Sequence, residues 1–183
     1  EAQRRAEPAA TQRELAAQVE RARAAGIPLT HIDTHMGAVL HPALIHGYAQ
    51  LALGQRLVPM IPRMDGAQLQ QRGMSAEDAD SVARLFAELE SAGAPLIDHI
   101  TGMPLDDPRD QLDYAKRAFD ALPSGITVFI LHPAEDTPEL RAIAPDWPSR
   151  VANFETFMRP EITRYLKQIG AHVIGYRALQ ALL

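Results

Sequence analysis

The sequence has 183 residues, of which 46% are hydrophobic and 22% are charged, so it can bury one full core and is not disordered. Its net charge of -5 argues against a nucleic-acid partner, and the absence of cysteine excludes disulfides and thiolate metal sites. No apolar stretch reaches the roughly 20 residues of a membrane span and no secretory signal is visible, so we expect one soluble, cytoplasmic domain over residues 1–183.

Residues 1–94 predict helices that alternate with strands. The sequence Thr11-Gln12-Arg13-Glu14 has the pattern of a capping box, and Gly26 is placed to end the helix that it starts, so residues 1–10 are expected to be a frayed lead-in. Ser75 is placed to cap a later helix. We expect, in chain order, a helix over 11–25, a strand over 30–34, a helix over 42–53, a strand over 57–61, a loop through 66–73 and a helix over 76–92.

The same alternation continues in residues 95–183. The stretch 126–131 is an unbroken apolar run, which is typical of a strand buried on both faces. Strict alternation predicts an α/β fold with parallel strands and right-handed crossover helices. The expected elements are a strand over 95–100, a helix from 107–108 to 122, a strand over 126–131, helices over 138–143, 147–158 and 161–168, a strand over 172–176 and a helix over 177–183.

Three groups that can bind a metal or move a proton alternate along one predicted strand. They are His31, Asp33 and His35, and side chains two positions apart in a strand share a face. Gly37 then lets the backbone turn sharply. The trio is therefore a candidate site, and the alternative is a hydrogen-bonded group at a strand end.

Polar residues also follow the other predicted strands. In parallel α/β proteins, binding and catalytic sites lie at the carboxyl ends of the strands, so this distribution strengthens the case for a site. The residues are Arg63, Asp98, His99, His132, Tyr176 and Arg177.

Each member of the trio has a predicted role and an alternative. We predict that His35 and His31 bind a metal, although His35 could cap the turn and His31 could orient its neighbours through its ring N–H. Asp33 could be a ligand, a partner that orients a ligating histidine or a turn acceptor; we favour the partner role and count it among the catalytic groups.

The remaining candidates are assigned from their chemistry. His132 is the predicted general acid or base, because a histidine pKa near neutrality suits proton transfer. Arg63 is predicted to anchor a substrate oxygen or an active-site carboxylate, or else to pair with Asp65. Four histidines are predicted to be structural or to lie at the rim of a site: His41, His46, His99 and His172.

Three stretches resemble one enzyme family. Residues 28–37 resemble the P-T-H-x-D-[ST]-H signature of YdjC-like carbohydrate deacetylases, also called the ChbG/HpnK family. Residues 131–134 resemble the later His-Pro motif of that family, and residues 169–177 resemble its C-terminal ending.

The resemblance implies an incomplete (β/α) barrel of the polysaccharide-deacetylase type. It also implies a divalent metal ion, Mg or Zn, and hydrolysis of an N-acetyl group on an amino sugar or related oligosaccharide. In the family, the second histidine of the signature binds the metal, which corresponds to His35, and the later histidine lies in the active site, which corresponds to His132.

The sequence departs from the family at its start. The family's early Asp-Asp and Gly-x-His motifs are absent, since the only Asp-Asp pair is Asp106-Asp107, and the chain begins with Glu1. We therefore expect the C-terminal two-thirds of a barrel, whose first strand lacks a neighbour and which on its own forms oligomers, binds metal weakly and releases no acetate. The alternatives are a catalytically inactive homologue that binds a glycan or a partner and, less favoured, a metal-dependent phosphoesterase.

Overall fold

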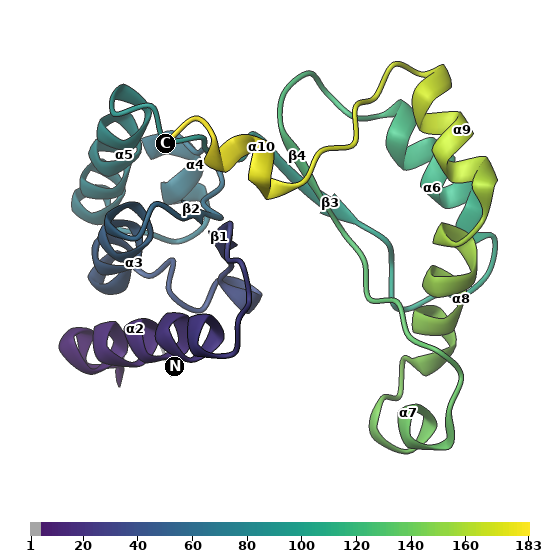
Figure 1. The fold of residues 1–183 in the computed structure, drawn as a ribbon. Helices are drawn as coiled ribbons and strands as arrows, with labels where there is room; N and C mark the ends of the chain where they lie inside the picture. Colours follow the sequence, from purple (N-terminus) through teal and green to yellow (C-terminus); the bar gives the residue numbers. More distant parts are fainter. Residues whose placement is uncertain (1–4) are drawn as a thin grey trace. The chain divides into compact units, whose positions relative to one another are not determined.

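The computed structural model describes residues 5–183, which form two compact units (Figure 1). The first unit runs to Ile97 and takes in Ile174–Leu183, and the second unit is Asp98–Val173. Both contain parallel strand pairs and helices, which confirms the predicted mixed α/β class. A single domain over residues 1–183 stays a prediction.

The first unit is built on the parallel pair β1 and β2, in which His31 lies opposite Val58. A further parallel bridge joins Pro62 to Ile97. Its elements are α2 (Pro8–Ala24), β1 (His31–Ile32), the 3-10 helix η1 (His35–Gly37), α3 (Pro42–Gly54), β2 (Val58–Pro59), α4 (Gly66–Gln71), α5 (Ala76–Ser91) and α10 (Tyr176–Gln180).

The core of the first unit lies between α3, α5 and the β1–β2 pair. Helix α3 buries Leu44, Tyr48 and Ala52, and helix α5 also buries residues at helical spacing. Ile32 of β1 packs against this cluster. The buried members from α5 are Ala79, Val82, Leu85, Phe86 and Leu89.

Two helix starts in this unit differ from the sequence prediction. Helix α2 begins at Pro8, because the Glu7 carboxylate accepts the backbone N–H groups of Ala9 and Ala10 at 3.1 and 2.6 Å. The predicted start at Thr11 is therefore wrong: its hydroxyl donates to the carbonyl of Glu7 inside the first turn.

The predicted loop after residue 65 is wrong as well. Residues Gly66–Gln71 form α4, which a full capping box starts: the Asp65 carboxylate accepts from the N–H of Gln68, and the Gln68 side chain accepts from the N–H of Asp65. The predicted Ser75 cap of α5 is confirmed, with Oγ 3.1 Å from the N–H of Asp78.

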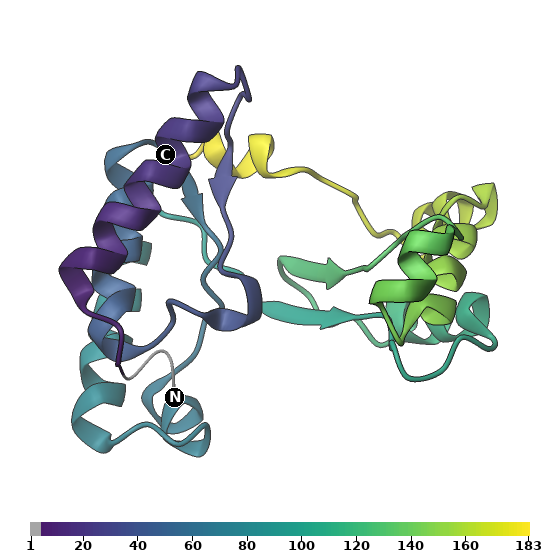
Figure 2. The same cartoon turned by 90° about the horizontal axis from the view of Figure 1, so that it is seen from below.

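The second unit places helices beside the parallel pair β3 and β4 (Figure 2). Its core joins Ala115 and Phe119 of α6 to Ile162 of α9, and the rings of Phe119, Phe129 and Phe157 lie together. Its elements are β3 (His99–Gly102), α6 (Gln111–Asp120), β4 (Thr127–Ile130), α7 (Pro138–Ile143), α8 (Trp147–Phe157) and α9 (Pro160–Gln168).

The strand predicted over 95–100 forms at the later position His99–Gly102. Gly102 permits the pairing there, because a Cβ on this residue would lie 2.5 Å from the carbonyl oxygen of Ile130. Strand β4 is only partly buried, with Ile130 39% exposed, so the predicted burial on both faces is wrong.

Three further predictions for the second half are wrong. Helix α6 begins at Gln111 rather than near Asp107, because Asp110 adopts a left-handed conformation (φ 50°) before it. Residues 172–175 form no strand, and Tyr176 opens helix α10. The helices predicted over 138–143, 147–158 and 161–168 do form, as α7, α8 and α9, but no strand separates them, so the alternation is not strict.

None of the helices in the described part of the chain has the length and hydrophobicity needed to cross a membrane.

Candidate functional site

The predicted trio does not lie on one strand. Strand β1 ends at Ile32, and His35 begins the 3-10 helix η1. The strand cannot continue through this stretch, because Met36 and Gly37 both have positive φ, 55° and 66°, and because Thr34 Oγ1 accepts the N–H of Val39. The expectation that one strand face presents all three groups is therefore wrong.

His31 is the most constrained of the three side chains. It is half-buried, its Nδ1 lies 3.1 Å from Thr30 Oγ1, and its ring stacks on Tyr176 with centroids 3.8 Å apart and an angle of 4°. Burial lowers the pKa of His31, and the nearby carboxylate of Asp33 opposes this effect. The neutral imidazole, which can accept a proton or bind a metal, is therefore favoured.

Two tyrosines complete this part of the first unit. Tyr48 donates its hydroxyl to the carbonyl of Ile32 at 2.6 Å and accepts the N–H of Met60 at 3.1 Å, which ties the ends of β1 and β2 together. The hydroxyl of Tyr176 is buried and has no hydrogen-bond partner among the described residues, and burial raises its pKa to about 12.

Asp33 and His35 are exposed, and Arg63 forms an ion pair with Glu90 of α5. The backbone of Arg63 is fixed by its N–H, which donates to the carbonyl of Ile97 at 2.6 Å. The predicted anchoring role of Arg63 stays a prediction.

The described residues do not by themselves form a metal site. Residues 5–183 contain no group of three or more His, Asp or Glu side chains placed to hold one ion. A catalytic zinc usually has three protein ligands, so the described residues alone do not complete such a site, and we assign no reaction step to a metal. The ligand roles of His31 and His35 stay predictions.

In the second unit, a buried polar network holds the backbone that follows β4. The N–H of His132 donates to Asn153 Oδ1 at 3.2 Å, Asn153 Nδ2 donates to Gln111 Oε1 at 2.9 Å, and Gln111 Nε2 donates to the carbonyl of Asp107. Asn153 is fully buried and Gln111 is 4% exposed. The position of His132 is thus fixed from helices α6 and α8.

The ring of His132 has a nitrogen with unmet hydrogen-bonding capacity. Its Nδ1 is buried and without a hydrogen-bond partner in the described part of the chain. A carboxylate lies in its neighbourhood: the hydrogen bond from Arg150 lowers the pKa of Asp146, and nearby His132 lowers it further by a smaller amount. Because Nδ1 is buried, a proton exchanged with a bound molecule would have to pass through Nε2.

Sequence reasoning missed Asn153 and Gln111 as parts of the candidate site, and it placed Tyr176 at a strand end without its contact with His31. Asn153 is the only asparagine in the sequence and lies within a predicted helix, which is a usable signal. Asp98 and His99 are structural: Asp98 Oδ2 accepts the N–H of Ile126 at 2.7 Å, and His99 Nε2 lies 3.1 Å from the carbonyl of Ser124.

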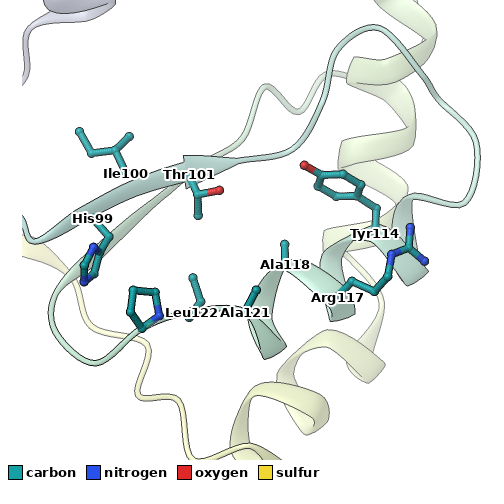
Figure 3. Close-up of a pocket in the computed structure, with 9 residues that line it drawn as sticks. His99, Ile100, Thr101, Tyr114, Arg117, Ala118, Ala121 and Leu122 are labelled. Carbon is teal, nitrogen blue, oxygen red and sulfur yellow. The ribbon is translucent and has the colours of Figure 1, made fainter. Parts of the chain in front are cut away.

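A pocket of about 430 Å³ opens between β3 and α6 in the second unit (Figure 3). His99, Thr101, Tyr114 and Arg117 lie around it together with apolar side chains. None of the predicted catalytic or metal-binding residues lines this pocket, so its volume is no argument for the predicted site.

Comparison with known proteins agrees with the motifs. A family model described as YdjC-like protein matches residues 1–168. The chain belongs to the YdjC-like family. This confirms the resemblance predicted from residues 28–37 and 131–134.

This YdjC-like chain also matches individual proteins. It is 34% identical over 180 residues to a carbohydrate deacetylase from Thermus thermophilus, a match that covers 98% of this chain and 63% of that protein. It superposes with a TM-score of 0.69 and 16% identity on a crystal structure named for cellobiose-phosphate cleavage, from Enterococcus faecalis V583, over 96% of this chain and 62% of that one. The chain therefore spans less than two-thirds of the length of either protein.

Proposed function

We propose that this YdjC-like protein is a hydrolase that removes an N-acetyl group from an amino sugar or a related glycoconjugate. The observation that carries the proposal is the 34% identity to a carbohydrate deacetylase over nearly the whole chain. In the reaction, the oxygen of water bonds to the acetyl carbon, the C–N bond breaks, and the leaving amine takes up a proton, which yields acetate and a free amino sugar.

His132 is the group that we assign to the proton transfer to the leaving amine. Its support is geometric: Asn153 and Gln111 fix the backbone of His132, and the burial of Nδ1 leaves Nε2 as the ring nitrogen for contact with a substrate. General acid–base catalysis typically contributes about 10²–10⁴-fold to the rate, so a large share of turnover would depend on this residue.

Residues of the first unit have proposed roles as well. We assign Asp33 to orienting His31, whose pKa it influences, and Arg63 to anchoring a substrate oxygen. The same proposal includes dependence on a divalent ion, Mg or Zn, with His35 and His31 as ligands. It also includes an incomplete (β/α) barrel of the polysaccharide-deacetylase type. The metal part is tested by elemental analysis of His35→Ala, which should lose most of the bound metal of the full-length protein.

The activity is tested by measuring acetate release from an N-acetylated amino-sugar disaccharide by the full-length protein. We expect His132→Ala to lower kcat by about 10²–10⁴-fold. The matched control is His46→Ala, an exposed histidine on α3, which should keep the wild-type rate. Full kcat in His132→Ala would refute the assignment.

The same assay separates the alternatives. Phosphate release from phosphorylated sugars without acetate release would favour a phosphoesterase. Retained binding of the disaccharide without any turnover would favour the non-enzymatic glycan-binding homologue.

A further inference from the structure

We propose that Tyr176 is a positioning residue that fixes the imidazole of His31 by covering one face of its ring. The two side chains come from elements far apart in the sequence, β1 and α10, and their rings lie almost parallel, 4° from coplanar, with centroids 3.8 Å apart. The consequence for catalysis rests on the proposed function, but the positioning itself does not.

The strand determines which way His31 points. Ile32 packs into the cluster formed by α3 and α5, and neighbouring side chains on a strand point to opposite faces. His31 therefore lies on the face of the β1–β2 pair that is turned away from this core. On that face it would be free to rotate about χ1 and χ2 unless another element covered it.

Helix α10 supplies that cover. Its Gln180 side chain donates to the carbonyls of Leu29 and Arg56 at 3.3 and 2.8 Å, and Leu179 is buried. These contacts dock the helix beside the starts of both strands, and the docked helix carries Tyr176 at its first turn.

A contact at the edge of the imidazole ring restricts its remaining rotation. Thr30 Oγ1 lies 3.1 Å from Nδ1, so Nδ1 is occupied and Nε2 is the nitrogen left for contact with a bound molecule. The stack fixes the plane of the ring and Thr30 fixes its rotation within that plane. Together they preorganise Nε2, which a catalytic or ligating group requires.

The aromatic ring of Tyr176, rather than its hydroxyl, makes this contact. The hydroxyl is buried and has no partner among residues 5–183, so no described hydrogen bond through it holds the ring in place. Tyr176→Phe should therefore preserve the stack, and Tyr176→Leu should remove it. The two variants separate the ring from the hydroxyl.

The test uses the full-length protein with labelled histidine, read by NMR of the His31 ring protons, which His31→Asn identifies. In the wild type we expect these signals to be shifted upfield by the ring current of Tyr176. Tyr176→Phe should keep the shift and Tyr176→Leu should abolish it. Ala178→Ser, at an exposed position of α10, is the matched control and should leave the signals unchanged.

The kinetic arm measures acetate release by the same variants. An aromatic pair contributes about as much free energy as a 2- to 13-fold change in rate. Loss of the stack in Tyr176→Leu should therefore lower kcat by about that factor, with KM little changed. Tyr176→Phe should restore the wild-type kcat, which a hydroxyl acting on the substrate would not allow.

The outcomes are distinct. His31 signals that do not move in Tyr176→Leu, or that lose their shift in Tyr176→Phe, would overturn the proposal. If Tyr176→Leu fails to fold by circular dichroism, the Phe variant decides alone. A wild-type protein that releases no acetate would defeat the proposed function, while the NMR result would still decide the positioning of His31.

Discussion

The polar network beneath His132 makes Asn153→Ala the most informative stability experiment. The substitution removes a side chain that accepts from the N–H of His132 and donates to Gln111 Oε1. Both groups then lose a protein partner. Asn153 is fully buried, so water does not reach the site directly.

The expected loss follows from the burial of the two partners. A buried polar group left without a hydrogen bond costs about 1–3 kcal/mol. Gln111, 4% exposed, should incur most of that cost, whereas half-buried His132 lies near the lower limit. The free energy of unfolding should fall by roughly 2–4 kcal/mol, which lowers Tm by about 4–16 °C at this chain length.

Thermal melts of Asn153→Ala, Asn153→Asp and the exposed control Glu155→Ala measure this effect. Asn153→Asp adds a pH dependence, because burial raises the pKa of the new carboxyl above its ordinary value of about 3.9. Below that raised pKa, its O–H can donate to Gln111; above it, the ionised group cannot. The folded state binds the extra proton, so stability should fall as pH rises through the folded-state pKa.

Two results would refute this reasoning. The first is an Asn153→Ala variant that melts with the Glu155→Ala control. The second is an Asn153→Asp variant whose stability relative to wild type does not change between about pH 4 and pH 8.

Three other predictions concern stability. Gly102→Ala should destabilise the β3–β4 pair, since the new Cβ would meet the carbonyl oxygen of Ile130; denaturant titration should show a lower midpoint. Tyr48→Phe should cost about 0.5–1.5 kcal/mol in the same titration, because the carbonyl of Ile32 loses one of its two donors and keeps the N–H of Met60. The pKa of His31 is lowered by burial, so its contribution to stability is complete above about pH 6.5 and is lost as pH falls through the folded-state pKa; His31→Gln should melt with a weaker dependence on acid pH than wild type.

Helix ends were predictable where a residue close in the sequence determines them. Ser75 caps α5 as predicted, and the helix predicted over 161–168 forms as α9, with Pro160 at its start. The prediction failed at α4 although its signal was present, because Asp65 and Gln68 have the spacing of a capping box.

Strand positions were less predictable because pairing decides them. The apolar pattern predicted the third strand over 95–100, but β3 pairs with β4 only from His99 to Gly102. Gly102 has no Cβ, so its backbone can approach Ile130 closely. The burial of a strand also depends on the surfaces that pack against it, and the apolar run 126–131 carries no information about those surfaces.

The titratable residues of the candidate site were predictable, but the residues that hold them in place were not. His31 and His132 stand out by chemistry, whereas Tyr176 and Asn153 act through contacts with residues distant in the sequence. The family resemblance supplied the motif but not these contacts.

The docking of α10 has a consequence for synthesis on the ribosome. The Gln180 side chain donates a hydrogen bond to the carbonyl of Leu29, which lies 151 positions earlier. The surroundings of His31 are therefore completed only after the intervening second unit has been made. At about 5–20 residues per second, that delay is roughly 8–30 s. During this interval the nascent chain carries the signature histidines without the Tyr176 ring that stacks on His31, so the surroundings of His31 become complete only when Tyr176 has been made.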